Sequence, residues 1–275
     1  MTKQTFIHGD FEMSYLEWGS GVDTVLCFHG FGRQANDYQI FTPLLTSNQR
    51  LIAVDLHAHG TTSFTARQDT KQWVAPQEWL EFMEAFFLFK SIKKFHLMGY
   101  SMGGRIALCL WQWKPHLVQS LFLAATDGLN RNLLYRFASG TVLGRKFYRM
   151  IIDKPQFLFT LAGLLKKSGI LHPKLYRFVH VHLDTKTKRQ QVYDSWLAYR
   201  YFFPNLRILG QIHGSNAIPF FLIFGKNDSV IRPKLAQNLL NHFNTKVEVY
   251  YLDAGHRLLN ADLIDFIRDH DAWPK

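Results

Sequence analysis

Runs of apolar residues alternate along the chain with stretches in which apolar side chains recur every three or four positions. The apolar runs lie at 24–30, 50–60, 93–101, 120–126, 219–228 and 246–256. Because they are continuous rather than alternating, they are typical of strands covered on both faces, as in a parallel sheet. A shorter run at 14–19 predicts one further, antiparallel strand near the N-terminus.

Helical spacing of apolar residues separates these runs. It predicts helices over 76–92, 104–114, 233–243 and 257–270. The first begins with Pro76, and proline is favoured in the first helical turn. Alternating strands and helices imply a mostly parallel sheet with right-handed crossovers. The pattern therefore predicts the α/β class, with helices flanking the sheet.

The alternation is interrupted once. After the strand run at 120–126, no further strand run occurs before residue 219. The interval is rich in Leu, Phe, Tyr, Lys and Arg and predicts several helices inserted between two strands. We therefore expect a core of residues 1–127 and 216–275, and an α-helical insertion over 128–215. A chain of 275 residues is long enough for one large domain with such an insertion.

Composition fits a globular protein, with 47% hydrophobic residues and two cysteines, each in an apolar run. Two such cysteines indicate buried thiols rather than a disulfide framework. The first ten residues lack the apolar segment of a signal peptide. The longest lipid-like stretch, 157–165, is far too short to span a membrane. We expect a soluble, cytoplasmic protein without a transmembrane segment.

The net charge of +11 is concentrated in the insertion. Residues 128–215 contain 15 Lys and Arg against 3 Asp and Glu, whereas the rest contains 17 against 18. One interpretation is a solvated basic face on the helices. The other is an anionic partner or substrate, such as a phosphate-bearing thioester, an acidic acyl carrier protein or an anionic membrane surface. Without a recognised binding motif, nucleic acid is not expected.

The most informative motif surrounds Ser101. The sequence GYSMG at 99–103 fits G-x-S-x-G and lies between a predicted strand and a predicted helix. In this motif the serine occupies a sharp, strained turn, and the glycines let strand and helix approach closely. The helix N-terminus then directs backbone N–H groups at the site. The alternative is a glycine turn whose serine has no role.

A serine hydroxyl is a weak nucleophile that needs a base, and the base needs a carboxylate to orient it. His256 follows the last strand run and is the expected base. Asp228 follows the preceding run and is the expected carboxylate, with Asp127 as its rival. Asp253 is close to His256 in sequence but is expected on the strand, pointing elsewhere. A polar loop histidine and a surface turn aspartate are the alternatives.

The developing oxyanion also needs hydrogen-bond donors. The turn HGFG at 29–32 follows a strand run, and we expect the backbone N–H groups of Phe31 and Met102 to converge on the oxyanion. An ordinary glycine turn is the alternative. His29 is expected to make hydrogen bonds within its loop rather than to act as a second base.

With these parts in this order, the sequence resembles the α/β-hydrolase fold family over nearly the whole chain. The carrying motifs are HGFG at 29–32, VDLHAHGTTS at 54–63, GYSMGG at 99–104, GKND at 225–228 and AGH at 254–256. The resemblance implies an eight-stranded, mostly parallel sheet with a helical cap after the sixth strand, where the insertion stands. One departure is Ala58, where family members often have glycine. Alanine is expected to be tolerated unless that position requires a positive φ.

The family also narrows the chemistry. Serine rather than aspartate at position 101 favours cleavage of an ester, thioester, amide or C–C bond over dehalogenation or epoxide hydrolysis. We expect a serine hydrolase that cleaves a carboxylic ester or thioester through an acyl-enzyme, without metal or organic cofactor. The apolar run in the insertion suits an acyl chain of modest size. A lyase or C–C hydrolase with the same triad, and a non-catalytic ligand-binding protein, are the alternatives.

Overall fold

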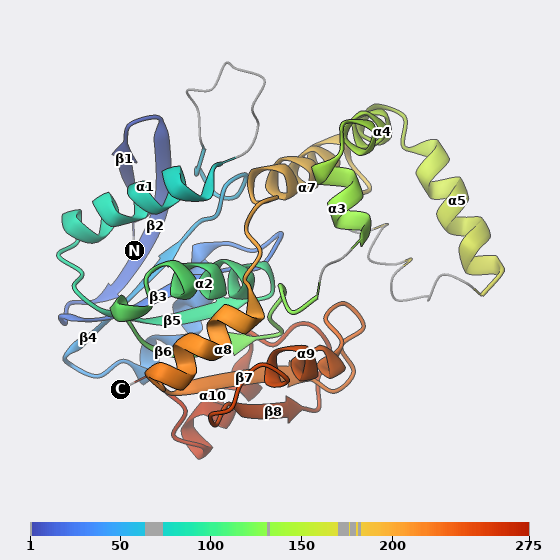
Figure 1. The fold of residues 1–275 in the computed structure, drawn as a ribbon. Coiled ribbons are helices and arrows are strands. Elements are labelled where there is room, and N and C mark those ends of the chain that lie inside the picture. The colour runs from blue at the N-terminus through green and yellow to red at the C-terminus, as the bar shows by residue number, and fades with distance from the viewer. Residues whose placement is uncertain are drawn as a thin grey trace. The chain divides into compact units, whose positions relative to one another are not determined.

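The computed structural model describes residues 2–63, 74–130, 133–169, 176, 180 and 183–274. Within these residues the chain divides into two compact units (Figure 1). The first contains 2–63, 74–130 and 201–274 and holds the sheet. The second contains the described residues between 133 and 200 and is helical.

Eight strands of the described chain form one sheet. They are β1 (Gln4–His8), β2 (Phe11–Gly19), β3 (Asp23–Phe28), β4 (Gln49–Val54), β5 (Phe95–Tyr100), β6 (Val118–Ala124), β7 (Phe220–Gly225) and β8 (Glu248–Leu252). The spatial order is β1-β2-β4-β3-β5-β6-β7-β8. The pairs β1–β2 and β2–β4 are antiparallel, and all the other pairs are parallel. The predicted fold class is confirmed.

Helices cover both faces of this sheet, which explains the continuous apolar runs. Those of the sheet unit are η1 (Ala35–Leu44), α1 (Pro76–Phe89), α2 (Met102–Trp113), η2 (Pro115–Leu117), α8 (Leu206–Ser215), η3 (Pro233–Leu235), α9 (Ala236–Leu240) and α10 (Ala261–Asp269). Val25 and Cys27 of β3 belong to a buried cluster with residues of η1 and α10. The next residue, Phe28, meets Trp79 of α1 with 6.1 Å between ring centroids. Successive strand residues therefore pack on opposite layers.

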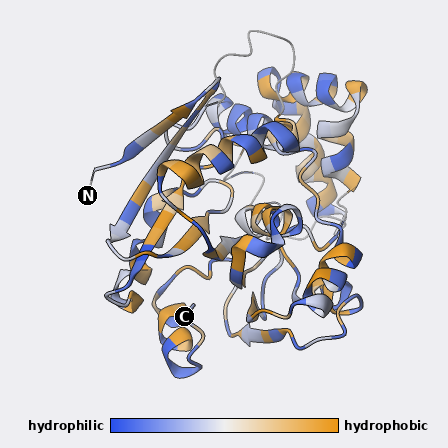
Figure 2. Cartoon of the chain, turned by 60° about the vertical axis from the view of Figure 1, so that its left-hand side comes forward, coloured by the Kyte–Doolittle hydropathy of each residue, from blue (hydrophilic) through white to orange (hydrophobic). Residues whose placement is uncertain are grey.

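The second unit contains α3 (Leu133–Gly140), α4 (Val142–Asp153), α5 (Gln156–Lys167) and α7 (Lys186–Ala198). Figure 2 shows hydrophobic and hydrophilic residues alternating along the helices of the chain. No helix among the described residues is both long and apolar enough to cross a membrane.

Residues 201–215, which we expected in the insertion, group with the sheet unit. The reason is the packing of α8. The ring of His213 lies 5.9 Å from that of Trp111 on α2. A Cβ added at Gly210 would meet the carbonyl oxygen of His242 at 1.8 Å, so α8 passes against this backbone. Interior contacts tie α8 to the sheet layer.

Several predicted boundaries shift. The strand expected over 50–60 ends at Val54, where a loop begins, and the helix expected over 257–270 starts at Ala261. Asn260 caps that helix, accepting a hydrogen bond from the Leu263 N–H at 3.2 Å. Strand β1 was not predicted, because Phe6 is its one buried residue and no apolar run marks it.

Candidate active site

Ser101 lies between β5 and α2 in a backbone conformation that serine rarely adopts. Its φ is 52° and its ψ is −116°. A positive φ at a residue other than glycine stores strain and is often associated with function. The turn is held by hydrogen bonds from the Ser101 N–H to the Ala124 carbonyl and from the Asp127 N–H to the Ser101 carbonyl, both at 3.0 Å.

The flanking glycines are required by close packing. A Cβ added at Gly103 would lie 1.8 Å from the carbonyl oxygen of Phe28, at the end of β3. A Cβ added at Gly99 would lie 2.7 Å from the Cα of Gly104. Backbone cannot move aside as a flexible side chain can. Glycine at these positions is therefore what lets α2 start so close to the sheet.

Three predicted residues meet in one chain of hydrogen bonds. The Nε2 atom of His256 is 3.1 Å from the Ser101 Oγ, and its Nδ1 is 2.7 Å from the Asp228 Oδ2. Since a carboxylate accepts, His256 carries its proton on Nδ1, and Nε2 is free to accept the serine hydroxyl. The Asp228 side chain is fully buried, whereas that of His256 is 22% exposed.

Hydrogen bonds to the second carboxylate oxygen, Oδ1, hold the Asp228 side chain in place. Its Oδ1 accepts hydrogen bonds from the backbone N–H groups of Val230 at 2.8 Å and Ile231 at 2.9 Å. These two bonds satisfy a buried carboxylate that would otherwise be costly. They also leave Oδ2 directed at His256.

The rival carboxylates have other partners. The Oδ2 of Asp127 is 3.5 Å from the Arg105 Nη1, and its Oδ1 accepts from the Gly128 N–H at 2.7 Å. Asp253 is exposed and accepts from the Asn227 amide at 3.2 Å. The carboxylate that accepts the hydrogen bond from His256 is therefore that of Asp228.

Tyr100, which precedes the serine, contacts His256, and the sequence did not predict this contact. Its hydroxyl donates to the backbone carbonyl of His256 at 2.8 Å, and the two ring centroids are 5.4 Å apart. Burial raises the pKa of Tyr100 well above its ordinary value, so the hydroxyl stays a donor. No sequence signal marks this contact, because 156 positions separate Tyr100 from His256 in the chain.

The turn expected to supply oxyanion donors lies beside the serine. A Cβ added at Gly30 would be 3.1 Å from the Cβ of Ser101. Phe31 follows Gly30, and Met102 is the first residue of α2. The first N–H groups of a helix have no partner within the helix and are available to an anion.

Two buried histidines fasten this turn to the loop after β4. The His29 Nδ1 donates to the Gly30 carbonyl at 2.7 Å, and its Nε2 accepts from the Leu56 N–H at 2.9 Å. The His59 Nε2 accepts from the Gly32 N–H at 2.9 Å. Burial, reinforced by the neighbouring His59, lowers the pKa of His29 to about 3. Burial also lowers the pKa of His59. Both rings are therefore neutral at pH 7, as acceptors must be.

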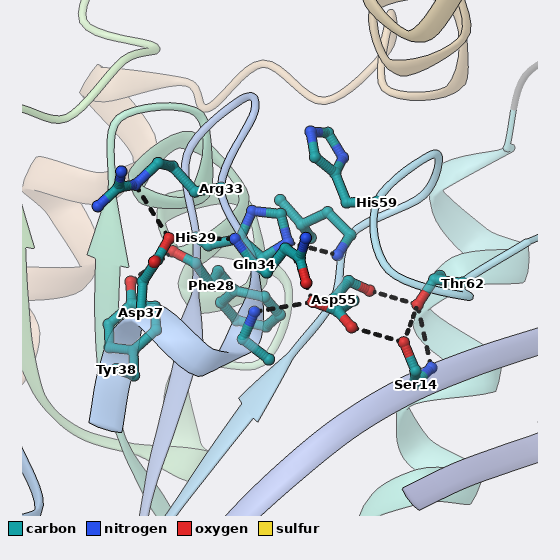
Figure 3. Close-up of polar contacts among 12 residues, drawn as sticks. Ser14, Phe28, His29, Arg33, Gln34, Asp37, Tyr38, Asp55, His59 and Thr62 are labelled. Atoms are coloured by element: carbon teal, nitrogen blue, oxygen red, sulfur yellow. Dashed lines mark hydrogen bonds and ion pairs between the residues drawn. The ribbon is translucent and has the colours of Figure 1, made fainter. Parts of the chain in front are cut away.

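Asp55 anchors the same loop from the sheet. Its Oδ2 accepts from the Ser14 hydroxyl at 2.6 Å (Figure 3). Its Oδ1 accepts from the Ala35 N–H at 2.7 Å, and its Oδ2 also accepts from the Lys3 ammonium at 2.7 Å. Burial pushes the pKa of this carboxyl up. The hydrogen bonds from Ala35, Lys3 and Ser14 outweigh burial and hold the pKa below its ordinary value. The sequence did not predict this network or the His59 contact. It did single out the motif at 54–63, in which Asp55 and His59 lie.

Ala58, in the same loop, has a φ of 64°. The position therefore requires the left-handed conformation that glycine adopts without strain. The condition under which alanine was expected to be tolerated is not met.

The sheet order, the strained serine turn and the loops at the strand ends define a class of protein. A sequence model of the α/β hydrolase fold matches residues 23–259, and the chain belongs to this family. Among solved structures, it superposes on MGS-M2, an α/β hydrolase enzyme from a Medee basin deep-sea metagenome library. The TM-score is 0.68 at 17% identity, covering 99% of this chain and 98% of that one.

Curated relatives share about a quarter of their residues with this chain over the aligned region. Lipase 1 of Psychrobacter immobilis is 26% identical over 266 residues, covering 92% of this chain and 77% of the lipase. The dihydrolipoyllysine-residue acetyltransferase component of the acetoin cleaving system of Pseudomonas putida is 25% identical over 260 residues, or 92% of this chain. The alignment spans 65% of the length of that acetyltransferase component.

Proposed function

We propose that the protein is a serine hydrolase that cleaves a carboxylic ester or thioester through an acyl-enzyme. The observation that carries the proposal is the hydrogen-bonded chain from Ser101 through His256 to Asp228, with the serine in a strained turn. The similarity to lipases supports ester substrates.

In the first half-reaction, His256 takes the proton of the Ser101 hydroxyl on Nε2 as Oγ attacks the substrate carbonyl carbon. The backbone N–H groups of Phe31 and Met102 stabilise the oxyanion that forms. Asp228 keeps the imidazole in the required tautomer and stabilises the imidazolium. The imidazolium then protonates the leaving alcohol or thiol, and the acyl group remains on Oγ.

In the second half-reaction, water replaces the alcohol. His256 takes a proton from the water as its oxygen attacks the acyl carbon, and the Ser101 oxygen leaves and regains a proton. The carboxylic acid is released. Every proton is accounted for by one imidazole, and the chemistry calls on no metal or organic cofactor.

We propose that the helical insertion is the cap domain that the family resemblance implies. Its basic character would favour an anionic acyl substrate over a neutral one through long-range attraction. Support comes from the charge split along the chain, with 15 of the 32 Lys and Arg in residues 128–215.

The proposal is tested with a fluorophosphonate probe and a series of p-nitrophenyl esters of graded chain length. The wild type should be labelled and should hydrolyse at least one ester, and Ser101→Ala should do neither. Labelling of Ser101 without turnover of any ester or thioester would instead favour the lyase or C–C hydrolase alternative. Absence of labelling would favour a binding protein.

A further inference from the structure

Helix α4 exposes an apolar strip on the side opposite its buried one. Leu143, Phe147 and Met150 recur at the spacing that places residues on one helical face, and each is at least 40% exposed. Tyr148 and Ile152 lie toward the opposite side of the helix and are buried. The helix therefore uses one apolar side for packing within its unit and leaves a second apolar side uncovered.

Helix α5 repeats the arrangement. Phe157, Leu161 and Leu164 have the same spacing and are likewise at least 40% exposed, while Ala162 is buried. The rings of Phe147 and Phe157 meet edge to face, with 6.3 Å between their centroids, so the two strips join. We call these six residues on two helices the α4–α5 apolar surface. Exposed apolar patches of this kind mark interaction sites.

The charge around this surface is predominantly positive. The described stretch 133–169 contains seven Lys and Arg and a single acidic residue, Asp153, which pairs with Lys186 at 2.7 Å. Lys146, Lys154 and Lys167 are exposed. On a helix with 3.6 residues per turn, Lys146 and Lys167 flank the two apolar strips and Lys154 stands at the end of the α4 strip.

We propose that the α4–α5 apolar surface binds an anionic lipid bilayer, lying in its interfacial plane with the lysines among the headgroups. Apolar side chains on one helical face and lysines beside them are the features of interfacial helices, in which long basic side chains reach the headgroups. A soluble acidic partner would match the lysines but not six exposed apolar side chains. A second copy of the chain would match the apolar side chains but would bring like charges together.

The surface is independent of the proposed hydrolase function, because none of its residues belongs to the site around Ser101. The test therefore measures binding rather than turnover. Vesicles of phosphatidylcholine with about 30% phosphatidylserine are compared with vesicles of phosphatidylcholine alone, in a co-sedimentation assay at low and high salt. Ser101→Ala should bind as the wild type does, whatever its activity.

Binding should require both features. Lys146→Gln with Lys154→Gln should lower the partition coefficient for anionic vesicles by about 25-fold, since each charge contributes about fivefold. Leu143→Ser with Leu161→Ser should lower it by about tenfold or more for each leucine. All four positions are exposed, so circular dichroism and urea unfolding should match the wild type.

Matched controls lie on and after α1, in the sheet unit. Leu88 is exposed to 82%, and Lys93 and Lys94 are exposed beyond the helix. Leu88→Ser, and Lys93→Gln with Lys94→Gln, should leave vesicle binding within about twofold of the wild type, because scattered surface residues carry little of an interfacial interaction.

Results of three kinds would overturn the proposal. The first is a wild type that does not sediment with anionic vesicles at low salt, or control variants that lose as much binding as the surface variants. The second is self-association of the wild type, lost in Leu143→Ser with Leu161→Ser. The third is an increase in KM for a soluble short ester in lipid-free buffer in those variants, which would make the surface a lining for the acyl chain.

Discussion

At the scale of single residues, the proposed reaction depends first on Ser101, whose hydroxyl oxygen is the nucleophile. Ser101→Ala removes the nucleophile but keeps a small side chain, so the fold should remain. Ester hydrolysis should fall to near background, as loss of a triad nucleophile costs about 10⁶ in kcat in a well-studied hydrolase of unrelated fold. Steady-state kinetics with the best p-nitrophenyl ester measure the effect. Retention of a tenth of the activity would rule out the acyl-enzyme mechanism.

Asp228 and Asp127 offer a matched pair of carboxylates near the ends of β7 and β6. Asp228→Asn should cost about 10⁴ in kcat, because an amide there favours the wrong tautomer of His256. Asp127→Asn should cost far less, since Asp127 faces Arg105 and the Gly128 N–H. Comparing kcat for the two variants under identical conditions checks this. The reverse order would transfer the orienting role to Asp127.

Ala58→Gly should stabilise the protein. Relief of strain at a φ of 64° outweighs the greater entropy of glycine in the unfolded chain, so the free energy of unfolding should rise by about 0.5–1 kcal/mol. Urea denaturation gives the value. Ala85→Gly, in the middle of α1, is the control and should destabilise by about 1 kcal/mol. A loss of stability in Ala58→Gly would show that the alanine methyl matters more than the backbone.

At the scale of elements, the turn after β3 and the loop after β4 depend on neutral histidines. The pKa of His29 is about 3 in the folded protein and about 6.5 when unfolded, so between these values only the unfolded state is protonated. Stability is therefore complete above about pH 6.5 and is lost as pH falls. From pH 7 to pH 5, His29 should remove about 2 kcal/mol from the free energy of unfolding.

The measurement is urea unfolding at several pH values between 7 and 5. Burial lowers the pKa of His57 to about 4 and that of His59 as well, so the total slope should exceed the contribution of His29. His29→Gln cannot titrate and should flatten the slope by about one proton per molecule, whatever its stability at pH 7. An unchanged slope would mean that His29 does not carry this pH dependence.

The centres of the elements could be predicted from sequence, and their ends less well. Seven of the eight strands coincide with predicted runs, because burial on both faces leaves a continuous apolar record. The strand predicted over 50–60 extended too far, since the buried His59 lies in a loop rather than in a strand. Strand β1 could not be predicted from an apolar run, because all its residues except Phe6 are exposed.

The candidate site likewise contains residues that could be predicted from the sequence and contacts that could not. Ser101, Asp228 and His256 could be placed because each follows a strand whose end the sequence reveals. The hydrogen bonds from Tyr100 to His256 and from Gly32 to His59 could not, because they join distant positions through geometry that no local pattern encodes. For the same reason, the sequence could not decide whether φ at Ala58 is positive.

At the scale of the whole molecule, the chain separates its charge from its proposed chemistry. The residues named at the site lie in the sheet unit, whereas residues 131–200, which the second unit contains, carry 14 Lys and Arg against 3 Asp and Glu. A field of this kind affects encounter rather than the chemical step. Salt is therefore the variable that tests it, since the Debye length shrinks from about 10 Å at 0.1 M to about 3 Å at 1 M.

We expect kcat/KM for a negatively charged acyl substrate to fall steeply as salt rises from about 0.1 to 1 M, while that for a neutral ester of the same chain length barely changes. Lys166→Glu with Lys167→Glu, at the end of α5, should flatten the salt dependence for the anionic substrate only. Lys93→Glu with Lys94→Glu makes the same change of charge in the sheet unit and should leave it intact. Equal responses of the two substrates in the wild type would reduce the basic insertion to a solvated surface as far as catalysis is concerned.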